Sequence, residues 1–102
     1  MRLPAPPTAI FAVNDNTAIG AMSALRRRDL AIPGDISLVG YNDIPIVSRL
    51  STPLTTVRVP FDQIAAAVID LLTHGPAGEQ DRIRMATPTL IPRRSTAAPR
   101  QA

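Results

Sequence analysis

Two different spacings of apolar residues follow each other in the first third of the chain. Residues 8–13 form a short apolar and β-branched run that ends at Asn14, which predicts a strand buried on both faces. The spacing then becomes helical and predicts a helix that ends near Arg28, with Asn14 or Asp15 as its N-terminal cap. The apolar stripe of this helix consists of Ala18, Ala21, Met22 and Leu25.

A second buried strand is predicted at residues 36–39, after a turn at Pro33-Gly34. A strand, a helix and a strand with short connections indicate a parallel crossover, so both strands end at the same sheet edge. This edge would bring Asn14-Asp15 close to Tyr41-Asn42-Asp43. Ligands of open α/β sheets bind beyond the carboxyl ends of the strands. The pattern therefore predicts an α/β fold with polar side chains where a ligand is expected.

A second amphipathic helix is predicted at residues 61–73, because Pro60 suits its first turn and His74-Gly75-Pro76 ends it. Its broad apolar face consists of Phe61, Ile64, Ala65, Val68, Leu71 and Leu72. Without a partner, this face would form a sizeable exposed apolar patch or repack onto the remaining strands. In that case we expect weak stability, self-association or aggregation of the chain alone.

The remaining segments are short. After an irregular stretch, "LTTVRV" predicts a short or edge strand, and two more short strands are predicted at residues 83–86 and 89–95, after a loop at 75–82. The Pro-rich lead-in at residues 1–7 and the tail at 97–102 are expected to be disordered.

Composition narrows the class of protein. A chain of 102 residues allows one small domain at most, and with 3% aromatic residues its core must consist of Ala, Val, Ile and Leu. A net charge of +3 permits an anionic partner without requiring one. No stretch is apolar enough for a membrane span or a secretory signal, so we expect a cytoplasmic protein without a membrane partner.

Catalytic chemistry has no support in the residues. The five glycines match no phosphate-binding spacing, so no nucleotide cofactor is indicated. One histidine and no cysteine exclude multi-histidine and thiolate metal sites and histidine-based triads, so we expect neither a metal site nor an enzyme. Asp35 is interpreted as a turn residue rather than as an acid paired with Asp43. Arg26-Arg27-Arg28 and Arg93-Arg94 are interpreted as solvated charges, with nucleic-acid contact as the less favoured alternative.

Three segments together resemble one known family. "AIFAVNDNTAIGAMSALRRRDLAIPGDISLVGYNDIP", "STPLTTVRVPFDQIAAAVIDLL" and "PTLIPRRST" are similar, in this order, to the C-terminal part of LacI/GalR family transcriptional repressors. The resemblance implies a fragment of a two-lobed fold like that of type I periplasmic binding proteins, with a partial doubly wound parallel sheet. Residues 8–57 and 89–96 would belong to the C-terminal lobe, and residues 58–88 to the crossing into the N-terminal lobe.

The resemblance also implies a function and site residues. The family binds a small, sugar-like effector between its lobes and thereby controls operator DNA binding through a head domain that this sequence does not contain. Asn14 and Asn42 match effector-binding positions, although Asn42 replaces the usual acidic residue, and Phe61 matches the pocket wall. Val59 stands where sugar binders often have a polar residue. Asp15 is expected mainly to cap the helix, with direct effector contact as the alternative.

A homodimer is a further implication, because Ile19, Met22 and Leu50 match positions near the family's subunit interface. Met22 is equally well explained as an ordinary core residue. Two other functional hypotheses remain open from the sequence. The chain could be a fragment of a sugar-type solute-binding protein of a transporter, or a truncated remnant without an independent function.

Overall fold

Short strands and two helices alternate along the chain, as the sequence predicts. The computed structural model describes residues 4–75 and 83–101, so residues 1–3 and 102 and most of the predicted loop at 75–82 lie outside the described residues. The elements are β1 (Ala9–Phe11), α1 (Asp15–Arg27), β2 (Ser37–Val39), the 3-10 helix η1 (Pro45–Arg49), β3 (Thr56–Arg58), α2 (Phe61–His74) and β4 (Thr89–Ile91).

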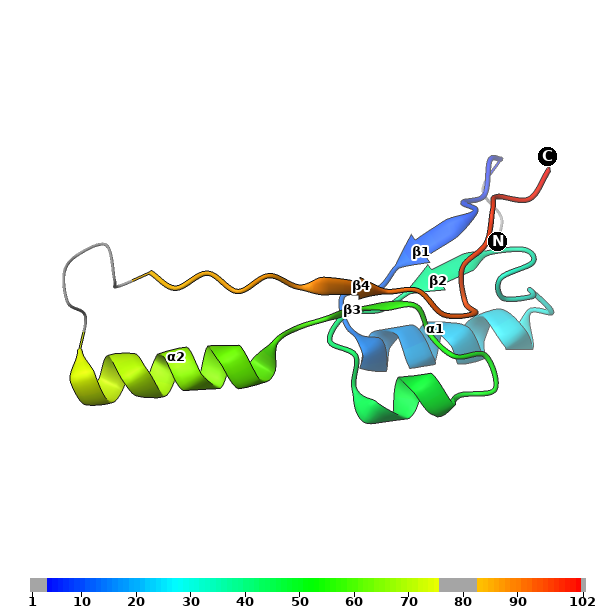
Figure 1. Cartoon of the computed structure of the whole chain (residues 1–102). Helices are drawn as coiled ribbons and strands as arrows, with labels where there is room; N and C mark the ends of the chain where they lie inside the picture. Colours follow the sequence, from blue (N-terminus) through cyan, green and yellow to red (C-terminus); the bar gives the residue numbers. More distant parts are fainter. Residues whose placement is uncertain (1–3, 76–82, 102) are drawn as a thin grey trace.

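The first crossover is confirmed. Strands β1 and β2 pair in parallel, with Ala9 opposite Ser37 and Phe11 opposite Val39, and α1 connects them and packs below them (Figure 1). Beyond the paired residues, the amide of Asp15 donates to the carbonyl oxygen of Tyr41 at 3.0 Å. The carboxyl ends of the two strands therefore meet at one edge of the sheet.

Strand β3 lies between the parallel pair β1–β2 and strand β4. Isolated parallel bridges join Val39 to Thr55 and Asn42 to Arg58, so β3 continues the sheet beside β2. On its other side β3 pairs antiparallel with β4, where Arg58 lies opposite Thr89. The predicted strand "LTTVRV" is therefore confirmed, and the polar end of β2 lies next to the end of β3.

Two predicted strands need correction. The strand expected at residues 83–86 is wrong: this segment has no regular secondary structure, because it follows α2 with no partner strand among the described residues (Figure 1). The strand predicted at residues 8–13 is not buried on both faces, since Phe11 and Val13 are 68% and 76% exposed. Only β2 pairs with β1 in the described part of the chain, and α1 covers one face.

The hydrophobic core lies between α1, the sheet and η1. Its buried members are Ala12, Ala18, Met22, Leu38, Val47 and Leu54. The predicted stripe of α1 points into it, with Ala18, Met22 and Leu25 buried and Ala21 partly buried. Aliphatic side chains thus form the core, as the low aromatic content predicts.

Helix α2 projects away from this core together with the segment that leads back to β4 (Figure 1). The molecule measures 55 × 28 × 20 Å and its radius of gyration is 18.0 Å, whereas a compact chain of this length has a radius of about 13 Å. No residue of α2 is buried, and Val68 and Leu72 are 48% and 76% exposed. Among the described residues, the segment at 84–86 borders this apolar face beside Ile64, Val68 and Leu71, and it leaves the face largely exposed.

A guanidinium group connects the described parts of the two termini, 4–7 and 97–101. Arg100 donates hydrogen bonds to the carbonyl oxygens of Pro7 and Asp35, so the tail contacts both the lead-in and the turn before β2. The Asp35 carboxylate accepts from the amide of Ala31 at 2.7 Å, which confirms Asp35 as a turn residue.

Candidate functional site

Asn14, rather than Asp15, caps helix α1. The backbone of Asn14 is extended, and its side-chain Oδ1 accepts a hydrogen bond from the amide of Thr17 at 2.8 Å. Its carbonyl oxygen accepts from the amide of Ala18 at 3.0 Å, which starts the helical hydrogen-bond ladder. The expectation that Asp15 is the cap is therefore wrong, and Asp15 is the first helical residue.

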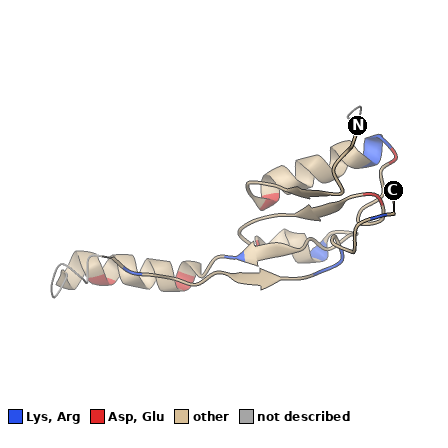
Figure 2. Cartoon of the chain, turned by 90° about the horizontal axis from the view of Figure 1, so that it is seen from above, with Lys and Arg blue, Asp and Glu red and all other residues tan. Residues whose placement is uncertain are grey.

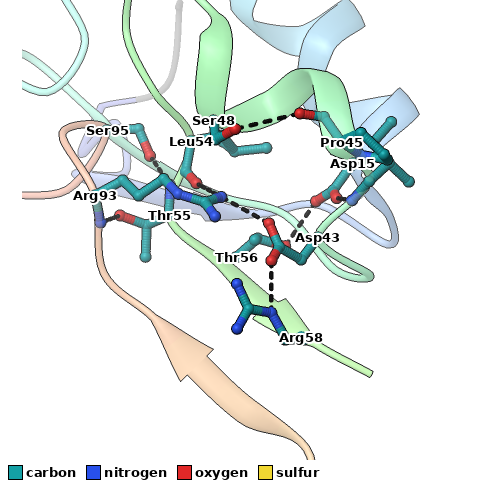
Figure 3. Close-up of polar contacts among 11 residues, drawn as sticks. Asp15, Asp43, Pro45, Ser48, Leu54, Thr55, Thr56, Arg58, Arg93 and Ser95 are labelled. Atoms are coloured by element: carbon teal, nitrogen blue, oxygen red, sulfur yellow. Dashed lines mark hydrogen bonds and ion pairs between the residues drawn. The ribbon is translucent and has the colours of Figure 1, made fainter. Parts of the chain in front are cut away.

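Asp15 instead joins three segments of the chain. Its carboxylate is completely buried; Oδ2 accepts from the amide of Ile44 at 2.8 Å, and Oδ1 accepts from the hydroxyl of Thr56 at 2.7 Å (Figure 3). Ile44 follows the polar end of β2, and Thr56 begins β3. Both oxygens accept hydrogen bonds from inside the protein, so Asp15 positions the strand ends.

Gly40 makes room for this buried carboxylate. A Cβ atom at Gly40 would lie 2.2 Å from Oδ1 of Asp15 and 2.8 Å from a methyl carbon of Leu54. Both distances are shorter than van der Waals contact, so any side chain would push Asp15 from its hydrogen bonds. The glycine at the end of β2 is thus required by packing.

Asp43, which follows Asn42, forms ion pairs with two arginines at the same sheet edge. Asp43 Oδ2 lies 2.8 Å from Nε of Arg58 on β3, and Oδ1 lies 2.8 Å from a terminal nitrogen of Arg93 (Figure 3). Arg93 also donates to the carbonyl oxygen of Leu54 at 3.0 Å. This cluster ties the strand that leads into α2 to the strand that returns from it.

Opposing effects determine the pKa of Asp43. Desolvation by burial raises the pKa, whereas hydrogen bonds and Coulombic attraction from Arg93 and Arg58 lower it, and the net pKa lies below the ordinary value of 3.8. Asp43 is therefore charged at neutral pH. Asn42 and Asp43 have φ angles of 117° and 63°, a left-handed backbone that Asn and Asp tolerate better than most residues.

Asn42 opens onto a hollow of about 600 Å³ at the start of α2. Its walls are formed by Asn42, Asp43, Pro45, Arg58, Val59, Pro60, Phe61, Asp62 and Gln63. The structure thus brings together Asn42, Val59 and Phe61, which the family resemblance assigns to the pocket. Asn14 is not part of this wall; it lies on the neighbouring strand end, one residue before the Asp15–Tyr41 hydrogen bond.

The predicted interface residues gather at a second place. Ile19 and Met22 of α1 line a groove with Leu50, and Arg26 and Arg27 border it. Met22 is 3% exposed and also belongs to the core, whereas Ile19 and Leu50 are partly buried at its margin. Both interpretations of Met22 therefore agree with its position.

Some site residues were missed from the sequence. Arg93 was interpreted as a solvated charge, but its side chain is 15% exposed and paired with Asp43, so that interpretation is wrong. Ser95 is completely buried, donates to the carbonyl oxygen of Leu38 and accepts from the amide of Thr55. Both residues lie in the segment "PTLIPRRST", but the sequence assigned them no site role because their partners are distant in sequence.

Two classes of site do not occur in the part of the chain that the structure describes. Residues 4–75 and 83–101 contain no group of three or more His, Cys, Asp or Glu that could hold a metal ion. None of the helices formed by these residues is long and apolar enough to cross a membrane. Basic and acidic residues alternate along the ribbon rather than gather in one element (Figure 2).

Comparison with known proteins identifies the family. A periplasmic binding protein-like domain matches residues 1–96. The ribose operon repressor of Escherichia coli is 39% identical over 95 residues, which cover 90% of this chain. A LacI family regulator from Lactobacillus casei, solved with bound glucose, has a TM-score of 0.74 at 32% identity over 88% of the chain. The lac repressor dimer, solved with operator and an anti-inducer, has a TM-score of 0.76 at 33% identity over 90% of the chain.

The fold and the arrangement of its strand ends define a portion of a periplasmic-binding-protein-like effector domain. The chain belongs to the LacI family of transcriptional regulators. It spans 28% of the ribose operon repressor, and 32% of each of the two solved chains. These relatives are transcriptional regulators rather than enzymes, in agreement with the absence of catalytic motifs.

Proposed function

We propose that this chain is part of a cytoplasmic repressor and binds a small, sugar-like metabolite. Binding of this effector would control the affinity for operator DNA, which a head domain outside this sequence contacts. The observation that carries the proposal is the hydrogen bond from the amide of Asp15 to the carbonyl oxygen of Tyr41. It holds Asn14 and Asn42 on adjacent strand ends, where ligands of α/β sheets bind. The glucose bound to the Lactobacillus casei relative supports a sugar-like effector. The operator bound to the lac repressor dimer supports the control of DNA binding.

The roles of the site residues follow from their hydrogen bonds. Asn14 uses Oδ1 to cap α1, so its side-chain amide nitrogen donates to the effector. Asn42 both donates and accepts from the wall of the hollow, and the ring of Phe61, which is 56% exposed, covers the apolar side of the effector. Asp15 contributes by positioning, because both of its oxygens are engaged inside the protein.

We also propose that two copies pair through the groove formed by Ile19, Met22 and Leu50. Ile19 and Leu50 are partly buried apolar side chains at a margin of the core, which suits a contact repeated across a two-fold axis. The solved lac repressor is a dimer bound to its operator, and symmetric dimers suit symmetric operators.

A chimaeric repressor tests the proposal. Residues 8–96 would replace the aligned segment of the Escherichia coli ribose operon repressor, and repression and its relief by a panel of sugars would be measured with an operator reporter. We expect repression together with a response to at least one sugar. Asn42→Ala should abolish the response and leave repression intact, and Asn14→Ser should weaken the response while keeping a cap on α1.

The exposed Arg28→Gln serves as the control and should change neither property. The proposal fails if the chimaera represses and responds to a sugar, yet both asparagine variants respond as the parent does.

A further inference from the structure

We infer that the effector carries an anionic group, either a carboxylate or a phosphate, and that Arg58 binds it. This inference rests on the proposed function, because it assigns the effector's chemical class to the same hollow. The starting observation is that Arg58 and Asn42 line the hollow together, and that an isolated bridge pairs their backbones.

Arg58 is held in a position from which it can bind a second anion. Its Nε is fixed by Asp43 at 2.8 Å, and Figure 3 joins this nitrogen, and neither of the two terminal nitrogens beside it, to Asp43. The side chain is 58% exposed, so these nitrogens are accessible from the hollow. A guanidinium group offers parallel donors that match the oxygens of a carboxylate or phosphate. Its fixed orientation reduces the entropy lost on binding.

The charges beside Asn42 favour an anion over a neutral sugar. Asp43 is 8% exposed and its two oxygens are each paired with an arginine, so this carboxylate does not accept from sugar hydroxyl groups. Two guanidinium groups and one carboxylate leave one positive charge in this cluster.

Two other wall residues have to be considered. Asp62 is an opposing carboxylate, but it is exposed and lies in the first turn of α2, where the helix dipole offsets its charge. Val59 adds no polar group that would bind a neutral sugar. The hollow therefore combines a neutral amide with a guanidinium group, a pair suited to a hydroxylated molecule that also carries a negative charge.

Tyrosine fluorescence of the 102-residue chain provides the test. Tyr41 is the single tyrosine, directly precedes Asn42, and the chain has no tryptophan. The probes are D-glucose, D-glucuronate and glucose 6-phosphate, which present one sugar with no charge, a carboxylate and a phosphate. We expect about tenfold tighter binding of at least one anionic probe than of glucose, the gain of roughly one charge-assisted hydrogen bond. The tighter of the two anions identifies the group.

Three variants assign the preference to Arg58. Arg58→Gln should bring the affinity for the anionic probe to within about twofold of the affinity for glucose. Arg58→Lys should retain part of the preference for the anion because the charge remains. Arg28→Gln removes the same charge from an exposed position at the end of α1 and should keep the preference. Circular dichroism of each variant should match the parent.

Two outcomes would overturn the inference. The first leaves the proposed function intact, and the second rejects it as well. If glucose binds as tightly as both anions and Asn42→Ala weakens all three, the effector site stands and the anionic group is wrong. If none of the probes changes Tyr41 emission, or Asn42→Ala leaves every affinity unchanged, the effector site itself is also rejected.

Discussion

The carboxylate of Asp15 and the hydroxyl of Thr56 form a completely buried hydrogen bond of 2.7 Å between the first turn of α1 and the start of β3. With the amide of Ile44, which donates to the other oxygen, this contact fixes the relative positions of three chain segments. The candidate effector residues lie on two of these segments, Asn14 beside Asp15 and Asn42 close to Ile44.

Replacement of Asp15 by alanine should lower the free energy of unfolding by about 3 kcal/mol, because it leaves the buried hydroxyl of Thr56 and the partly buried amide of Ile44 without an acceptor. Urea-induced unfolding followed by circular dichroism measures the change. Asp62→Ala is the matched control, since this exposed carboxylate should contribute less than about 1 kcal/mol. A double-mutant cycle with Thr56→Val should give a coupling of about 1 to 2 kcal/mol. Equal costs for Asp15→Ala and Asp62→Ala would contradict the assigned role.

Two glycine substitutions should have opposite effects. Gly40→Ala should destabilise the chain by about 2 kcal/mol or more, because the new Cβ would overlap Asp15 and Leu54. Gly20→Ala should stabilise it by about 0.5 to 1 kcal/mol, since Gly20 lies within α1 and an added methyl group there would meet no neighbouring side chain within 4 Å. Thermal unfolding of the two variants measures this, and a stabilising Gly40→Ala would show that the packing around Asp15 is looser than described.

Stability should fall at acidic pH partly through Asp43. Its pKa is lowered in the folded protein, so its contribution is complete above the unfolded-state pKa of about 4 and is lost as the pH falls through the lower folded-state value. Urea midpoints between about pH 6 and pH 2 should therefore decrease less for Asp43→Asn than for the parent chain. Asparagine tolerates the left-handed backbone at this position, which makes it the appropriate replacement. Parallel pH profiles for the two proteins would rule out this contribution.

The apolar face of α2 should cause the isolated chain to self-associate. Val68→Glu combined with Leu72→Glu should shift the weight-average mass in sedimentation experiments toward 10.9 kDa, because both side chains are exposed on this face. Ala66→Glu, on the opposite side of the helix, should leave the association unchanged. A chain that is monomeric without these substitutions would contradict the expectation.

The proposed dimer groove is tested in the chimaeric repressor, where the rest of the domain is supplied by the relative. Ile19→Glu should abolish dimerisation and reduce operator affinity by about tenfold or more, because it places a charge at the centre of an apolar contact. Arg28→Gln again serves as the control. Gel filtration and operator titration measure both properties, and a dimeric Ile19→Glu variant would exclude this groove as the interface.

Local patterns in the sequence determined the parallel crossover, both helices and the apolar face of α2, because helical stripes and buried runs depend on residues close together in the chain. They also placed Asn14 and Asn42 at one sheet edge. Only the tertiary structure decided that Asn14 caps α1 while Asp15 is buried, since either residue caps well by itself and the distinction comes from the distant Thr56. The pairing of Asp43 with Arg93 likewise required the fold. Asp43 precedes α2 and Arg93 follows it, so no local pattern in the sequence connects them.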